Sequence, residues 1–178
     1  MPRPKVAYSK IHAGHIAASL RRERPDLDQV DYLYLLYAQR VGRIIDAVHD
    51  KHCRKDFGIS SAEMRVLFAL RRAGSPYALR PTELFRSLLV TSGAITKQVD
   101  RLVLAGYVDR QPGPEKSGGS LIRLTDKGFA AADNALTALA DSSVVPHSAL
   151  TAEERQTALH ILEKILLHLE EHLDVDTD

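Results

Sequence analysis

Apolar residues recur at helical spacing along most of the chain, and the clearest example lies near its centre. Over residues 92–103 the apolar positions fall at i, i+4, i+7 and i+8, and they are Ile95, Val99, Leu102 and Val103. Thr91 or Ser92 can cap this helix, and Gly106 can end it because glycine readily adopts the left-handed conformation. The opposite face is small, hydroxylated and cationic, and it consists of Ser92, Gly93, Thr96, Lys97, Asp100 and Arg101.

A shorter helix is expected directly before this one. Thr82 can cap it, and Glu83 lies near its positive N-terminal end. Its apolar residues are Phe85, Leu88 and Leu89. Two helices in such close succession predict a helix-turn-helix. The polar face of the second helix has the size and chemistry to enter a DNA major groove, where hydroxyls, lysine and arginine reach base edges and phosphates.

A β-hairpin is expected after the second helix. Two short runs rich in β-branched or aromatic residues, 107–111 and 120–124, are separated by a loop rich in glycine and proline. Lys116 lies at the tip of this loop, and Arg110 and Arg123 flank it. Such a basic finger can reach a DNA backbone or a minor groove. The pattern therefore predicts a mainly α-helical fold with a small β-hairpin wing, which is a winged helix-turn-helix.

Four more helices are expected around this unit. A long helix begins at Asp28 or Asp31 and runs to about residue 56. A second begins at Ser60 or Ser61, and its apolar residues predict a support that belongs to the core rather than to a contact surface. Two further helices follow the wing, and they are expected over residues 126–139 and 151–173.

The last of these helices is apolar over more than half of its circumference. Its apolar residues are Leu159, Ile161, Leu162, Ile165, Leu166, Leu167, Leu169 and Leu173. A single small domain cannot cover such a surface, so a second copy of the chain is expected there. Dimerisation helices are therefore expected at 31–56 and 126–173, around a DNA-binding core at 60–125. Residues 1–30 are expected to form a helical extension, which either packs on the body or adds a wall to a ligand cavity or dimer interface.

The motifs of the central region resemble those of one known family. TSGAITKQVDRL at 91–102, AGYVDR at 105–110 and RLTDKG at 123–128 are together similar to the MarR family of winged-helix transcription regulators. The likeness extends from about residue 33 to residue 173. It implies a homodimeric repressor that binds a palindromic double-stranded DNA operator and is released by a small molecule or an oxidant.

The resemblance places the expected DNA contacts on the recognition helix, the helix before it and the wing. These contacts are Thr82, Thr91, Ser92, Gly93, Thr96, Lys97, Arg101, Arg110, Lys116, Ser117 and Arg123. Ser92, Thr96 and Lys97 are expected at base edges or on the floor of the groove. Arg101 is expected at a phosphate or as a brace of the wing. The wing departs from the family, which has Asp-x-Arg where this chain has Lys116-Ser117-Gly118, and lysine lacks the planar fork of arginine, so weaker sequence discrimination is expected from it.

The segments 21–28 and 71–84 are similar to a subgroup of the family that has an extra N-terminal helix, and some of its members respond to urate. The Trp, Asp, Arg and Arg associated there with urate align here with Leu20, Arg65, Gln98 and Arg110. Only the last is kept, so urate is not the expected ligand. Another anionic or aromatic effector is expected, with Tyr37, Arg65 and Arg110 as its candidate contacts.

Charge is unevenly distributed along the chain, although the net charge is only +1. Residues 1–80 hold 15 basic and 8 acidic side chains, residues 81–127 hold 7 and 5, and residues 128–178 hold 2 and 10. One explanation of this uneven charge is that the basic part of the chain contacts phosphate while the acidic part faces solvent. The alternative is that the charges lie on solvated helix faces that bind no partner. No apolar run reaches the roughly 18 residues of a membrane span and no signal core is seen, so a cytoplasmic protein without a membrane partner is expected.

Cys53 is the single cysteine, and it lies among histidines and cations at 49–55. Cationic neighbours lower the pKa of a thiol, so a thiol- or metal-responsive regulator is one alternative, and an unreactive cysteine is the simpler interpretation. No third close ligand completes a metal set, and no nucleophile elbow, phosphate loop or HExxH motif is present. No metal, cofactor or enzymatic activity is therefore expected. A helical adaptor that does not bind DNA is the remaining alternative.

Overall fold

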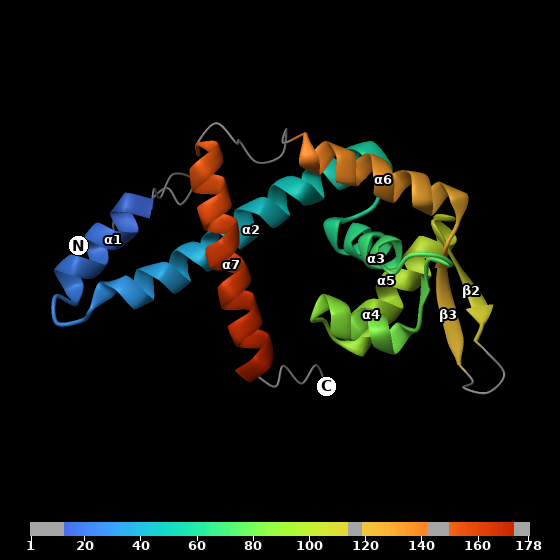
Figure 1. Ribbon diagram of the computed structural model, residues 1–178, viewed down its shortest axis with the longest axis horizontal. Coiled ribbons are helices and arrows are strands. Elements are labelled where there is room, and N and C mark those ends of the chain that lie inside the picture. The colour runs from blue at the N-terminus through green and yellow to red at the C-terminus, as the bar shows by residue number, and fades with distance from the viewer. Residues whose placement is uncertain (1–12, 114–118, 142–149, 173–178) are drawn as a thin grey trace, which may run out of the picture. The chain divides into compact units, whose positions relative to one another are not determined.

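The computed structural model describes residues 13–113, 119–141 and 150–172 (Figure 1). In chain order its elements are α1 (Ala13–Glu23), α2 (Gln29–Phe57), α3 (Ser61–Arg72), β1 (Ala78–Leu79), α4 (Pro81–Leu88), α5 (Ser92–Leu104), β2 (Val108–Pro112), β3 (Ser120–Leu124), α6 (Asp126–Ala140) and α7 (Ala152–His172). The chain divides into two compact units, residues 1–47 and 48–178, so the boundary falls within α2. A mainly helical fold with one small sheet confirms the predicted class.

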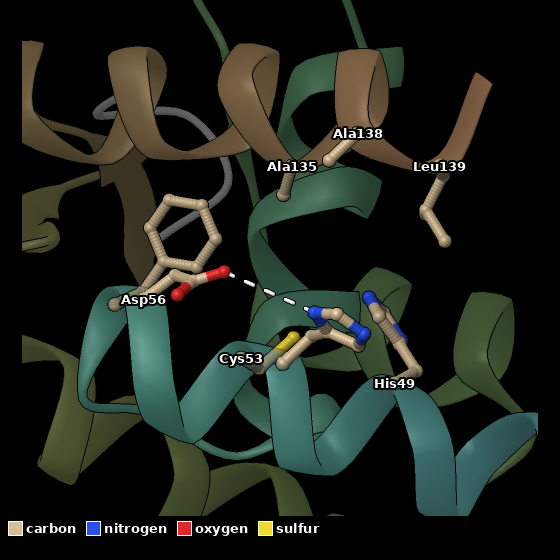
Figure 2. Close-up of a pocket in the computed structure, with 8 residues that line it drawn as sticks. His49, Cys53, Asp56, Ala135, Ala138 and Leu139 are labelled. Carbon is tan, nitrogen blue, oxygen red and sulfur yellow. Dashed lines mark ion pairs between the residues drawn. The ribbon is translucent and has the colours of Figure 1, made fainter. Parts of the chain in front are cut away.

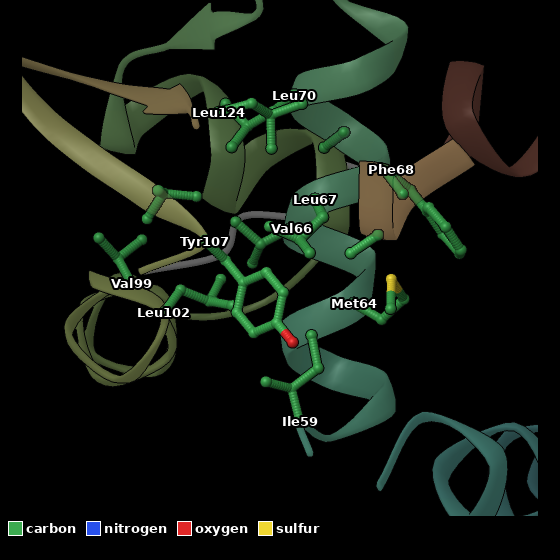
Figure 3. Close-up of a cluster of buried hydrophobic side chains, with 14 of the residues drawn as sticks. Ile59, Met64, Val66, Leu67, Phe68, Leu70, Val99, Leu102, Tyr107 and Leu124 are labelled. Atoms are coloured by element: carbon green, nitrogen blue, oxygen red, sulfur yellow. The ribbon is translucent and has the colours of Figure 1, made fainter. Parts of the chain in front are cut away.

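Helix α3 lies at the centre of the unit formed by residues 48–178. Ser60 caps it, since its Oγ accepts the N–H of Glu63 at 3.2 Å while Glu63 Oε2 accepts the N–H of Ser60 at 2.7 Å. The side chains of Met64, Leu67 and Leu70 are completely buried. Figure 3 shows this cluster, which also receives side chains from α5 and β3. The prediction that this helix supports the helix-turn-helix from within the core is confirmed.

Helix α4 begins and ends differently from the prediction. The N-cap is Arg80, whose N–H donates to Glu83 Oε2 at 2.6 Å, and Pro81 takes the first helical position, where no N–H is needed. The predicted cap at Thr82 is therefore wrong, and Thr82 lies inside the first turn. Leu89 was expected on the apolar side of the helix, but it follows the last turn with φ of 52° and is 59% exposed.

Helix α5 follows at once and is capped by Thr91, whose Oγ1 accepts the N–H of Ala94 at 3.3 Å. Its three innermost side chains are at most 1% exposed, and they are Ile95, Val99 and Leu102. Val103 is 36% exposed, so its assignment to the buried face is wrong. At 100° per residue it lies at the margin of the apolar stripe. Gly106, with φ of 74°, ends the helix as expected.

The wing is part of a three-stranded antiparallel sheet with the order β1-β3-β2. β2 and β3 pair in register from Val108↔Leu124 to Pro112↔Ser120, which confirms the hairpin. β1 pairs with the other edge of β3 through Ala78↔Arg123 and Leu79↔Ile122. This strand was not predicted, because two residues are too few to show a period.

The junction between the wing and α6 is closely packed. Thr125 caps α6, since its Oγ1 accepts the N–H of Gly128 at 3.1 Å, and the same hydroxyl donates to Gly106 O at 2.8 Å. A Cβ added at Gly128 would collide with the backbone oxygen of Tyr107. The Tyr107 hydroxyl donates to Phe57 O at 2.6 Å, so the start of the wing is tied to the end of α2.

The apolar side chains of α2 and α7 remain largely exposed. Asp28 accepts the N–H of Val30 at the start of α2, and Thr151 and Glu154 form a capping box at the start of α7. No described residue of α7 is buried. Half or more of the side chain is exposed at Leu35, Val41, Ile44, Leu159, Leu162, Leu166 and Leu167.

Within the described ranges, no helix combines the length and the hydropathy that a membrane crossing requires.

Candidate nucleic-acid interface

The outward face of α5 has the composition that the sequence predicted. Ser92, Gly93, Thr96 and Lys97 are all exposed. An added Cβ at Gly93 would have nothing within 4 Å, so this part of the face is open. Thr96 Oγ1 donates to Ser92 O at 3.0 Å, which leaves the hydroxyl oxygen able to accept from a ligand. The face therefore combines one lysine with two hydroxyls on small side chains, and it has no bulky group that would keep it out of a groove.

Arg101 lies on the same helix but is engaged within the body. Its Nη1 is 3.5 Å from Glu63 Oε1, and the side chains are 71% and 7% exposed respectively. The pair joins α5 to the capped start of α3. Sequence analysis offered a phosphate or the wing as the partner of Arg101 and missed Glu63, because a contact between residues so far apart leaves no local pattern.

Arg110 provides the connection between the wing and the recognition helix. Its Nη2 donates to Asp100 Oδ1 at 2.6 Å, which links β2 to α5. Both residues were placed on the DNA-facing side by sequence analysis, but they were not paired with each other. Both side chains are partly exposed, at 41% and 58%, so this pair favours the observed position of the wing by at most about 1 kcal/mol.

The cations that were predicted to contact DNA fall into two groups. Arg101 and Arg110 are paired with carboxylates, whereas Lys97 and Arg123 form no ion pair with any described residue. Arg123 is exposed on β3, opposite Asp109 in the register of the sheet. Both side chains are exposed and can reach an anion, although Asp109 faces Arg123 across the sheet.

Four further predicted DNA contacts are either only partly available or lie outside the described residues. Thr82 and Thr91 are exposed, but the hydroxyl of Thr91 already serves as the cap of α5. Lys116 and Ser117, at the expected wing tip, lie outside the described residues. Their role in a minor groove stays a prediction.

The predicted effector contacts come from both compact units of the chain. Tyr37 and Arg65 are half-buried and belong to different compact units. Arg110, the third candidate, is taken up by Asp100. The effector site stays a prediction.

A small pocket lies between the end of α2 and α6, and Cys53 is on its wall (Figure 2). Its volume of about 20 Å³ admits a single water molecule. The Cys53 side chain is 1% exposed, and His52 Nδ1 lies 4.0 Å from Asp56 Oδ2. Oxidation of a thiol requires access, so burial favours the unreactive interpretation. In the part of the chain that the structure describes, no three His, Cys, Asp or Glu side chains are grouped to hold a metal ion.

An exposed polar helix in a helix-turn-helix, with a β-hairpin braced beside it, defines a winged helix-turn-helix protein. Comparison with known proteins agrees with this class. Residues 57–116 match the model of the MarR family. The chain is 31% identical to the HTH-type transcriptional regulator PecS of Dickeya dadantii over 159 residues, which cover 89% of this chain and 95% of that protein.

Two further comparisons concern a second relative. The multiple antibiotic resistance protein MarR of Escherichia coli is 33% identical over 133 residues, which cover 71% of this chain and 90% of that protein. The crystal structure of a mutant of that protein complexed with operator DNA matches with a TM-score of 0.64 and 29% identity, over 79% of this chain and 99% of that chain. The chain belongs to the MarR family, and it is a winged-helix DNA-binding transcription regulator. The relatives are regulators rather than enzymes.

Proposed function

We propose that this regulator represses transcription in the cytoplasm by binding a palindromic operator as a homodimer. The exposed face of α5 carries the proposal, because Lys97 and the hydroxyls of Ser92 and Thr96 stand on a helix whose other face is fixed in the core. The hydroxyls reach base edges. Lys97, which the sequence placed at a base edge or the groove floor, is instead assigned to a phosphate together with Arg123, because neither cation forms an ion pair with a described residue. The complex of the E. coli relative with operator DNA supports this use of the fold.

The apolar surfaces of α2 and α7 are the proposed dimer interface. Leu162 and Leu166 are more than half exposed in the single chain, and burying such side chains against a second copy removes apolar surface from water. A two-fold pairing presents two copies of α5 to one duplex. Recognition helices roughly 34–36 Å apart fit successive major grooves, which is why the operator is expected to be palindromic.

A small anionic or aromatic molecule is proposed to end repression. Its candidate contacts are the ring of Tyr37 and the guanidinium groups of Arg65 and Arg110, and Arg110 binds it by exchanging Asp100 for the effector. An effector releases DNA only if it binds the DNA-incompetent arrangement more tightly. Because this coupling is reciprocal, operator DNA lowers the affinity for the effector by the same factor.

The test is a titration of duplexes selected from a random pool, followed by fluorescence anisotropy at several salt concentrations. Binding is expected to weaken as salt rises, and Lys97→Ala is expected to weaken binding to all sequences and to reduce the salt slope by about one per protomer. Arg72→Ala is the matched control, because Arg72 is exposed at the end of α3 and is assigned to neither DNA nor the dimer interface, and it should leave both quantities nearly unchanged. An affinity that ignores salt contradicts the proposed phosphate contacts.

Sequence recognition needs a separate measurement. Thr96→Ala is expected to relax the preference at one base position in each half-site by about 1–3 kcal/mol while leaving the salt slope unchanged. A folded dimer that shifts no duplex from the selected pool would instead favour the adaptor alternative.

A further inference from the structure

Glu63 has a carboxylate that serves two neighbours at once. Oε2 accepts the N–H of Ser60 at 2.7 Å and closes the cap of α3, while Oε1 lies 3.5 Å from Arg101 Nη1 on α5. The two partners differ in burial, since 7% of the Glu63 side chain is exposed against 71% of Arg101. A buried carboxylate needs a compensating cation, but an exposed guanidinium does not need a carboxylate. Arg101 is therefore the member of the pair that can leave its partner for another anion.

Neighbouring charges leave this assignment in place. Arg54 donates to Asp50 Oδ2 at 2.6 Å, and Asp50 Oδ1 accepts the N–H of Ser61 at 2.9 Å. Arg54 pairs with Asp50 and also acts coulombically on Glu63, but Arg101 is the cation in ion-pair contact with Glu63.

The consequence concerns the charge that α5 offers to DNA. Lys97 forms no ion pair with a described residue, but the charge of Arg101 is offset by Glu63. A neutral pair releases fewer counterions from DNA than a free cation does. The exposed recognition helix is therefore less cationic than its sequence indicates.

This inference rests on the proposed DNA binding. We propose that Glu63, on α3, is a positioning residue: its ion pair holds the Arg101 side chain of α5 against the body and away from DNA. Arg101 contacts a phosphate only by exchanging Glu63 for it. Lys97 makes its contact without such an exchange. The ion pair with Glu63 therefore lowers the affinity for every duplex. The reduction is largest for a random duplex, in which base contacts do not help to hold α5 in the groove.

Glu63→Gln tests the restraint, because the glutamine oxygen still accepts the N–H of Ser60 while the charge on Arg101 is no longer offset. Affinity for a random duplex at low salt is expected to rise severalfold, and the slope of log K against log salt to steepen by about 0.9 per protomer. Glu83→Gln is the matched control, since Glu83 caps α4 in the same way through the N–H of Arg80. It removes a carboxylate from the same region but is expected to leave the slope much less changed.

A double-mutant cycle separates the restraint from general charge effects. In an Arg101→Ala background, Glu63→Gln is expected to lose its effect on the slope. The inference is overturned if the effect persists in that background, or if Glu63→Gln and Glu83→Gln behave alike. Thermal unfolding confirms that each variant is folded.

A second measurement does not depend on Glu63→Gln. Arg101→Ala is expected to reduce the salt slope by less than Lys97→Ala does, because part of the charge of Arg101 is already offset. Equal reductions overturn the restraint while leaving DNA binding intact. A wild-type protein that binds no duplex would instead overturn the proposed function itself.

Discussion

The winged-helix body and the terminal helix α7 use the same kinds of apolar residue at the same spacing, but they bury them very differently. Leu67 and Leu102 are completely buried in the body, whereas Leu162 and Leu166 on α7 are 56% and 55% exposed. The difference teaches that a helical period predicts the helix but not what covers it. In the body the cover is the chain itself, and for α7 the proposed cover is a second copy.

Gly128→Ala should have the largest effect, because the body has no room where α6 meets the wing. The added Cβ would collide with the backbone oxygen of Tyr107, which cannot rotate away as a side chain can. A loss of about 4 kcal/mol or more in the free energy of unfolding is expected, measured by urea denaturation. Gly93→Ala is the control, since it meets open space in a helix and should stabilise by up to about 1 kcal/mol. Similar losses in both variants would contradict the packing.

Leucine substitutions compare the two regions directly. Leu67→Ala is expected to lower the free energy of unfolding by about 3 kcal/mol through the cavity it leaves. The double change Leu162→Glu and Leu166→Glu should leave the body folded but weaken the dimer by at least about tenfold, because charges would enter the proposed interface. Circular dichroism and analytical ultracentrifugation measure the two effects. A dimer that is unaffected by the glutamates would remove α7 from the interface.

Tyr107 gives a smaller effect that depends on pH. Burial raises the pKa of its phenol above the ordinary value, so the folded state holds the proton more tightly than the unfolded state. Stability is therefore expected to fall as the pH rises from about 10 toward the raised pKa. Tyr107→Phe should lose about 1 kcal/mol at neutral pH, with the hydrogen bond to Phe57 O, and lack this contribution to the alkaline decline. An equally steep decline in both proteins, followed by fluorescence or circular dichroism, contradicts the assignment.

Leu89→Gly should have the smallest effect, and it is expected to stabilise. Leu89 has a left-handed conformation, with φ of 52°, that disfavours a side chain. Glycine relieves this strain but is more flexible when unfolded, so a net gain of about 0.5 kcal/mol is expected. Leu104→Gly is the control, because Leu104 is equally apolar and 89% exposed but helical, and it should lose stability. Losses of equal size in both variants would contradict strain at Leu89.

The parts of the fold that were predictable have local causes. The caps at Ser60, Thr91 and Thr125 are hydrogen bonds to backbone groups a few residues away, and Gly106 ends α5 through its own φ angle. Where local rules competed, the prediction failed. Thr82 is a good cap residue, but Pro81 before it fits the first position inside the helix, and this moved the N-cap to Arg80.

The recognition face was predicted residue by residue, but its electrostatics were not. Sequence analysis found Lys97, Arg101 and Arg110, since hydroxylated and cationic residues share one side of a helix or flank a hairpin. Each cation was given a different contact with DNA or the wing, but none of the three was given a carboxylate partner. The structure pairs Arg101 with Glu63 and Arg110 with Asp100 and leaves Lys97 without an ion pair to any residue it describes.

By itself the sequence determined where most helices and the two wing strands begin and end and which face of α5 is polar, because these depend on neighbours within a few residues. Only the tertiary structure decided which cations are neutralised, why residue 128 must be glycine, and which apolar stripes stay exposed. Those properties arise from contacts between segments far apart in the chain. A buried carboxylate or a carbonyl oxygen acts over a few ångströms of space, whatever the number of residues in between.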